Sequence, residues 1–150
     1  MTVKYLDFPV IPKKFYQDVH DICTTSEDEL YKFVGEGYSS LQLYPIKGEL
    51  KEWILSNIPV EFGDCFHIHT IVNDVKPHKD HMNQKFKLNF IFHTGGGNVI
   101  TNFYNDDKNL ISSVCIKANT WHVFDGTISH SVHNIAYPRV AITLGTNTIL

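Results

Sequence analysis

The sequence predicts a mainly β protein, a sandwich or barrel of short antiparallel strands with supporting α-helices near the N-terminus. From Val60 onward, short runs rich in Ile, Val, Phe and Thr are separated by Asn, Asp, Gly and Pro. This texture is typical of antiparallel strands joined by tight connections. Before Val60, apolar residues recur at helical spacing. A chain of 150 residues is expected to form one domain around one sizeable core.

The N-terminal part, about residues 1–59, is expected to contribute helices and connections. Helices are predicted over Lys13–Thr24, from the acidic start Ser26–Glu29, and over Gly48–Asn57. In the third segment Leu50, Ile54 and Ile58 recur at four-residue steps, which indicates one buried stripe. Trp53 beside this stripe is interpreted as a core residue. The helices should therefore support a sheet.

The remaining residues, about 60–150, are expected to form the barrel. Strands are predicted over Cys65–Val72, Phe86–His93, Val99–Tyr104, Ile111–Lys117, Trp121–Phe124, Ser131–Ile135 and Arg139–Thr146. The run Gly95–Gly97 lacks the lysine and the spacing of a phosphate-binding loop. It is interpreted as a hairpin turn.

Composition excludes several classes of function. The formal net charge of -3 gives no general attraction to nucleic acid. Three cysteines, Cys23, Cys65 and Cys115, without C-x-x-C spacing favour neither a disulfide framework nor a zinc knuckle. No segment approaches the ~20 apolar residues that cross a bilayer. We expect a cytoplasmic protein that acts on a small molecule or peptide.

An imidazole and a carboxylate stand two positions apart at His78 and Asp80. On extended backbone this spacing places both side chains on one side, where they can bind the same metal ion. The pair alone is a weak signal, because the chain has 9 histidines and a solvated turn is the simpler interpretation. The metal hypothesis therefore needs a third ligand.

His130 is the candidate third ligand. It follows the first pair in the chain and precedes Arg139 by nine positions, and this order and spacing favour a shared site. Two histidines and a carboxylate occupy one face of an octahedral Fe(II) ion and leave adjacent positions open for a 2-oxo acid and dioxygen. His133 competes with His130, but lies on the opposite strand face. We predict that His78, Asp80 and His130 are the catalytic metal ligands.

Arg139 is the only arginine among the 13 basic residues. In the strand that it begins, Arg139, Ala141 and Thr143 share one face, and the apolar residues between them share the other. A buried guanidinium requires a partner, and its planar fork matches two carboxylate oxygens. The distal carboxylate of 2-oxoglutarate is the predicted partner, and a structural ion pair within the chain is the alternative.

These residues resemble the 2-oxoglutarate and Fe(II)-dependent dioxygenases, and among them the small prolyl-hydroxylase-like members, including those of marine phages. The resemblance covers about Cys65–Thr146 and rests on His78-x-Asp80, Gly95–Tyr104, Ser129–Val132 and Arg139–Thr143. It implies a double-stranded β-helix, the jelly-roll or cupin-like barrel. It also implies Fe(II), the cosubstrate 2-oxoglutarate and O2, and hydroxylation of a peptidyl proline, an amino acid or a small metabolite with release of succinate and CO2.

The second residue that binds the 2-oxoglutarate tail is open. In the family a serine two positions after the arginine or a tyrosine of another strand often helps, but position 141 is alanine. Asn89 is the first candidate, because an amide in an apolar strand needs a hydrogen-bond partner when buried. Thr101 and Thr143 are alternatives.

Other residues allow competing interpretations. His67 and His69 share a strand face and either line the cavity or pack as core histidines. With His93 or His130 they could form a cupin-type metal site, and a non-catalytic β-barrel binding module is a further alternative. His81, His93 and His122 are interpreted as surface or loop residues. Trp121 and Phe124 are expected to wall the substrate pocket or to belong to the core.

Overall fold

The computed structural model of the protein describes residues 2–25, 31–35, 38–80 and 83–150. The strands are β1 Lys4–Leu6, β2 Tyr31–Gly35, β3 Tyr38–Pro45, β4 Phe62–Ile71, β5 Val75–His78, β6 Phe86–His93, β7 Ile100–Tyr104, β8 Leu110–Val114, β9 Trp121–Asp125, β10 Ser129–His133 and β11 Arg139–Thr146. The helices are a 3-10 turn at Lys13–Phe15, α1 Tyr16–Thr25 and α2 Gly48–Asn57.

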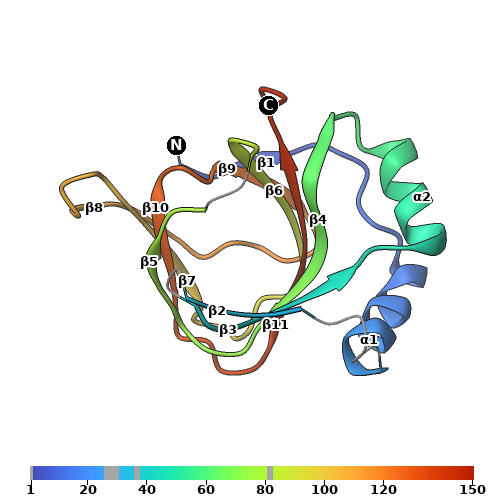
Figure 1. Ribbon diagram of the computed structural model, residues 1–150, viewed down its shortest axis with the longest axis horizontal. Helices are drawn as coiled ribbons and strands as arrows, with labels where there is room; N and C mark the ends of the chain where they lie inside the picture. Colours follow the sequence, from blue (N-terminus) through green and yellow to red (C-terminus); the bar gives the residue numbers. More distant parts are fainter. Residues whose placement is uncertain (1, 26–30, 36–37, 81–82) are drawn as a thin grey trace.

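The described strands form two antiparallel sheets that face each other (Figure 1). The larger sheet has the order β1-β9-β6-β11-β4-β3-β2, and the smaller has the order β5-β10-β7-β8. From β4 onward the chain passes between the sheets at each connection except the β7–β8 hairpin. This alternation is that of a double-stranded β-helix, so the predicted jelly-roll fold class is confirmed.

The helices pack on the outer face of the larger sheet (Figure 1). There Leu50 and Ile54 of α2 and Phe15 before α1 join a core cluster with strand residues such as Ile68 and Ile142. Trp53 is partly buried against the same cluster, which agrees with its interpretation as a core residue. The helices thus leave the inner face of the sheet free to line the barrel.

The alternation predicted for β11 is present. Ile142 and Leu144 are fully buried on the helix side, whereas Ala141 belongs to a cluster inside the barrel with Ile91 and Phe124. Because β11 is hydrogen-bonded to β4 on one side and to β6 on the other, it lies inside the sheet. The residues that share the face of Ala141 therefore point into the barrel.

The prediction that residues before Val60 form helices and connections was only partly right. Helices α1 and α2 lie where they were expected, and α2 has the predicted bounds. However, β1 pairs with β9, and β3 joins β2 to the edge of the larger sheet at β4. Pairing with existing sheet edges overrides a weak local pattern. The helix predicted to begin at Ser26–Glu29 lies outside the described residues.

The barrel strands agree with the sequence-based ranges apart from their ends, but two features differ. Strand β5, which carries His78, was not among the predicted strands. The run Gly95–Gly97 is not a hairpin turn, because it joins β6 of the larger sheet to β7 of the smaller sheet. Gly95 has a φ of 92° and Gly96 one of 145°, so the sheet crossing uses backbone freedom that glycine provides. No helix in the described part is long and apolar enough to span a membrane.

Candidate metal centre and adjoining pocket

Strand pairing brings two of the predicted ligands together. His78 and His130 are Cα partners across β5 and β10, so their side chains emerge side by side on the same face. Their ring centroids are 4.5 Å apart. Both residues are buried, at the inner wall of the smaller sheet.

The two imidazoles are oriented in the same way. His78 Nδ1 lies 2.8 Å from the carbonyl oxygen of Lys76, and His130 Nδ1 lies 2.8 Å from that of Ile128. Because a carbonyl oxygen only accepts, each Nδ1 carries the proton and donates it. The lone pair of each Nε2 is then available to a metal ion, an arrangement common in metal-binding histidines.

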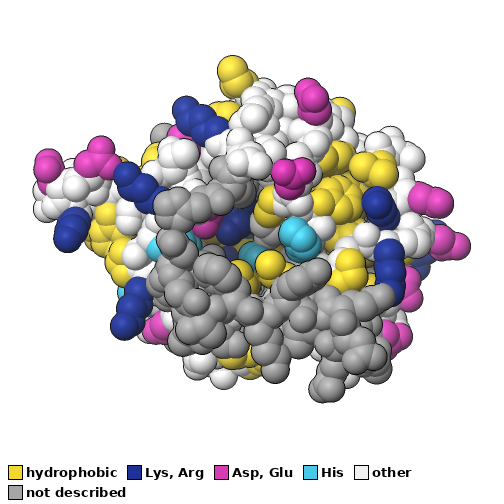
Figure 2. Space-filling model, in the orientation of Figure 1, with side chains coloured by type: hydrophobic (Ala, Val, Ile, Leu, Met, Phe, Trp, Pro, Cys, Tyr) yellow, Lys and Arg dark blue, Asp and Glu magenta, His cyan; other side chains and the backbone are white. Residues whose placement is uncertain are grey.

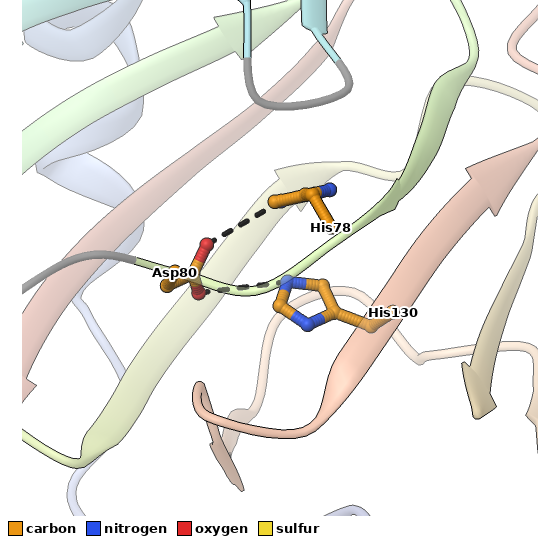
Figure 3. Close-up of side chains that lie close together, drawn as sticks. All are labelled: His78, Asp80 and His130. Carbon is orange, nitrogen blue, oxygen red and sulfur yellow. Dashed lines mark ion pairs between the residues drawn. The ribbon is translucent and has the colours of Figure 1, made fainter. Parts of the chain in front are cut away.

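Asp80 completes the group just beyond the end of β5 (Figure 3). Its Oδ1 lies 3.4 Å from His78 Nε2 and its Oδ2 lies 3.5 Å from His130 Nε2. The Asp80 amide donates to the carbonyl oxygen of Gly126 at 2.9 Å. A Cβ atom at Gly126 would lie 3.1 Å from Asp80 Oδ2, so glycine gives this carboxylate room.

The three side chains fit a metal ion. One ligand atom from each lies within 4.8 Å of the others. His130 Nε2 is buried and makes no hydrogen bond within the described part of the chain, although buried polar atoms normally have a partner. Two imidazole nitrogens and one carboxylate form the donor set that suits Fe(II) and leaves coordination positions open.

Lys87 is a neighbour of this group that the sequence did not indicate. It lies on β6 with its side chain nearly buried, and its Nζ is 3.3 Å from Asp80 Oδ2. Burial alone would raise the pKa of Asp80, but Lys87, His130 and His78 together hold that pKa well below its usual range. Asp80 is therefore a carboxylate, the form that binds metal.

A pocket inside the barrel adjoins the candidate ligands. His78, His130 and Lys87 line one part of it, and Arg139 also lines it. Apolar side chains of Ile91, Ile116, Phe124 and Val132 form much of the wall. In the space-filling view, cationic and histidine side chains are visible within the hollow at the centre of this face (Figure 2). Arg139 is 6% exposed, which places the only arginine of the chain at a buried site that favours an anion.

The other residues predicted to bind the cosubstrate lie in or beside this pocket. Asn89 and Thr101 line it, and Thr143 is buried beside Asn89, to which its hydroxyl donates at 2.8 Å. The role of these three residues stays a prediction.

The interpretation of His122 as a surface or loop residue was wrong. His122 lies on β9, is 1% exposed and lines the pocket. Its sequence context, between Trp121 and Val123, does not show which of the two strand faces points into the barrel. His69 also lines the pocket, whereas His93 is exposed, as predicted.

The alternative ligand sets are not assembled. Among the described residues, the only group of at least three His, Cys, Asp or Glu side chains within reach of one metal ion is His78, Asp80 and His130. His133 instead lies 2.7 Å from the hydroxyl of Ser131, and His67 and His69 have no such group around them. His81 lies outside the described residues.

The two aromatic residues proposed as pocket walls have different positions. Phe124 lines the pocket and packs edge-on against His130, with ring centroids 4.9 Å apart. Trp121 is fully buried in the core on the helix side, and its indole N–H donates to the carbonyl oxygen of Pro9 at 2.9 Å. Its position excludes Trp121 from the wall of the pocket.

Solved structures with a similar fold exist. The chain is similar to a prolyl-4-hydroxylase of Pseudomonas putida, with a TM-score of 0.63 and 15% identity over 98% of this chain and 93% of that one. It is also similar to an oxidoreductase of the 2OG-Fe(II) oxygenase family from Burkholderia pseudomallei, with a TM-score of 0.60 and 10% identity over 98% and 86%. No protein-family model and no curated protein matches the sequence. At these identities the likeness is one of fold.

Proposed function

We propose that the protein is an Fe(II)- and 2-oxoglutarate-dependent oxygenase that hydroxylates its substrate. The observation that carries this proposal is the buried group of His78, Asp80 and His130, with ligand atoms within 4.8 Å of one another, at a pocket that also contains Arg139. A metal-binding triad alone would suit several reactions. A buried guanidinium in the same pocket adds the recognition of a carboxylate.

Each residue of the candidate site would have a separate role. His78 and His130 would each offer Nε2, and Asp80 one carboxylate oxygen, to Fe(II). Arg139 would hold the distal carboxylate of 2-oxoglutarate, because its planar guanidinium matches two carboxylate oxygens and it lines the pocket beside the candidate ligands. Bound Fe(II) would allow O2, the oxidant, to oxidise substrate and 2-oxoglutarate together, so that one oxygen atom enters the hydroxylated product and the other enters succinate, with release of CO2. The apolar wall excludes water from the reacting atoms.

The substrate is proposed at the level of classes. The similarity in fold to a solved prolyl-4-hydroxylase favours a peptidyl proline first, with a free amino acid or a small metabolite as alternatives. Membership of the small phage-type group is part of the same proposal and rests on the sequence motifs alone.

The test is the conversion of 2-oxoglutarate to succinate by the purified protein with Fe(II) and O2. We expect slow turnover without substrate and faster turnover when a proline-containing peptide or another true substrate is added. Chelation of the iron should stop both. Binding of 2-oxoglutarate without any succinate, even with candidate substrates, would instead identify a non-catalytic binding module. Absence of both binding and turnover would overturn the proposal.

A further inference from the structure

A row of polar side chains crosses the inner face of the larger sheet. Asn89 on β6 is the Cα partner of His122 on β9 and of Thr143 on β11. Because residues in register on adjacent strands share a face, all three side chains point into the barrel. His69 on β4 reaches the same row through Thr143. All four residues are buried.

The hydrogen bonds along this row fix which atom donates and which accepts in each residue. The Thr143 hydroxyl donates to Asn89 Oδ1 at 2.8 Å, so its oxygen accepts from His69 Nδ1 at 3.0 Å. The amide nitrogen of Asn89 then donates to His122 Nε2 at 3.3 Å. Since Nε2 of His122 is an acceptor, the proton of this neutral imidazole is on Nδ1.

The Nδ1 atom of His122 has no hydrogen-bond partner within the described part of the chain. A buried N–H without an acceptor is unfavourable, so a ligand that places an acceptor at this position would bind more tightly. Burial, with the positive charges of Arg139 and Lys87, lowers the pKa of His122 to about 3. The imidazole is therefore a neutral donor at physiological pH, and it lines the same pocket as Arg139.

We propose that His122 is the second donor to the distal carboxylate of the 2-oxo acid held by Arg139, and that Asn89, Thr143 and His69 are the positioning residues that fix its tautomer. This inference rests on the proposed function and answers which residue joins Arg139. Asn89 and Thr143, which the sequence suggested for that role, donate to other members of the row. Ala141, two positions after Arg139, offers no hydroxyl.

In this position His122 is a determinant of specificity between 2-oxo acids with and without a second carboxylate. A 2-oxo acid with a second carboxylate would contact both Arg139 and His122, whereas 2-oxobutyrate, which ends in a methyl group, would contact neither through a charge. Loss of the His122 donor should therefore weaken binding of the dicarboxylate alone. A purely structural role would affect both ligands alike.

The experiment measures equilibrium binding of 2-oxoglutarate and of 2-oxobutyrate to the Fe(II) protein by calorimetry without oxygen. For His122→Phe we expect 2-oxoglutarate affinity to fall about 10- to 100-fold, the range for a hydrogen bond to a charged group. Affinity for 2-oxobutyrate should change less than about 2-fold. His93→Phe, at an exposed histidine on β6, is the matched control and should change neither.

Three further variants keep the test informative if the phenylalanine disturbs folding. His122→Asn places an amide near the position of Nδ1 and should recover most of the 2-oxoglutarate affinity. Thr143→Val breaks the row without touching the ligand and should show a smaller loss with the same selectivity, which Thr143→Ser should restore. Equal losses for both 2-oxo acids, or unchanged 2-oxoglutarate affinity, would overturn the assignment. If the wild-type Fe(II) protein binds neither acid, the proposed function itself fails.

Discussion

Lys87 and Asp80 form an ion pair in a nearly buried position, with 3.3 Å between Nζ and Oδ2. A buried carboxylate that loses its cation is strongly destabilising, by about 3–5 kcal/mol in measured cases. A metal ion bound by Asp80 would neutralise the same carboxylate. The stability of the metal-free protein should therefore depend on Lys87 more than that of the metal-bound protein.

We predict that Lys87→Met lowers the melting temperature of the metal-free protein and increases the rise that a divalent metal produces. Differential scanning fluorimetry with and without Mn(II) measures both. The matched control is Lys85→Met, because Lys85 pairs with Asp125 at 3.5 Å and its side chain is 57% exposed. Exposed pairs contribute only ~0–1 kcal/mol. An equal metal-induced rise in wild type and Lys87→Met would contradict this prediction.

Two buried histidines make stability depend on pH. Burial is the main cause that lowers the pKa of His69 well below its ordinary value and that of His122 to about 3. Between the lowered pKa of each folded-state histidine and its ordinary value of 6.5, the unfolded chain binds protons that the folded chain does not. The stabilisation is present above pH 6.5 and is lost as the pH falls towards the folded-state pKa.

Urea unfolding of the metal-free protein between pH 7.5 and 5 should show a free energy of unfolding that decreases with falling pH. Each such histidine contributes at most about 1.4 kcal/mol per pH unit. His122→Phe should have a shallower pH dependence than wild type, whatever its absolute stability. The same slope in both proteins would show that His122 is not held neutral by the fold.

For single residues, the sequence was informative where several residue types occurred in a specific order and spacing. His78, Asp80 and His130, which the sequence grouped by their order and spacing, do lie close together, and Arg139 lines the adjoining pocket. Their roles as ligands and as the anion-binding residue stay predictions. Lys87 and Gly126 could not be identified, because their roles depend on proximity to Asp80, which sequence separation hides. His122 was missed because only the strand register shows that it faces inward.

Among the secondary-structure elements, the pairing of β5 with β10 brings two of the three candidate metal ligands together. This register places His78 opposite His130, and β11 places Arg139 on the inner face by the alternation that its apolar residues predicted. Strand β5 itself has only 4 residues, one of them Pro77, which gives little β-signal. Its strand character comes from the partner rather than from local preference.

The connection between β6 and β7 also supports Arg139. Gly95 has a φ of 92°, and its carbonyl oxygen accepts from the amides of Ala136 and Tyr137 at 2.8 and 3.1 Å. A Cβ atom here would lie 2.9 Å from Ile135 Cδ1 and 3.1 Å from Arg139 Cβ. The turn thus fixes the chain just before β11.

We predict that Gly95→Ala reduces the free energy of unfolding by about 1–3 kcal/mol and weakens 2-oxoglutarate binding, because Arg139 must shift. Urea unfolding and calorimetric titration measure the two effects. Gly97→Ala is the control, since a Cβ atom there meets nothing within 4 Å. It should change stability by less than about 0.5 kcal/mol. Loss of stability with unchanged 2-oxoglutarate affinity would separate this turn from the function of Arg139.

In the whole molecule, the main apolar core and the candidate site lie on opposite faces of the larger sheet. The outer face packs against α1 and α2 (Figure 1). The inner face carries Arg139 and the polar row, which line or adjoin the pocket. The helical stripe predicted helices that support a sheet, and the alternation along 139–144 predicted that Arg139 points into the barrel. The sequence did not predict that β1, β2 and β3 extend the larger sheet, because edge pairing is a property of the assembled sheet.

The central claim is that three side chains bind one ferrous ion. It is tested most directly by equilibrium binding of Fe(II) to wild type, Asp80→Ala and the control Asp106→Ala, whose carboxylate is 93% exposed, without oxygen. We predict one Fe(II) per chain in wild type and in the control, and a loss of affinity on the order of 100-fold or more in Asp80→Ala. Wild-type affinity in Asp80→Ala would contradict the account.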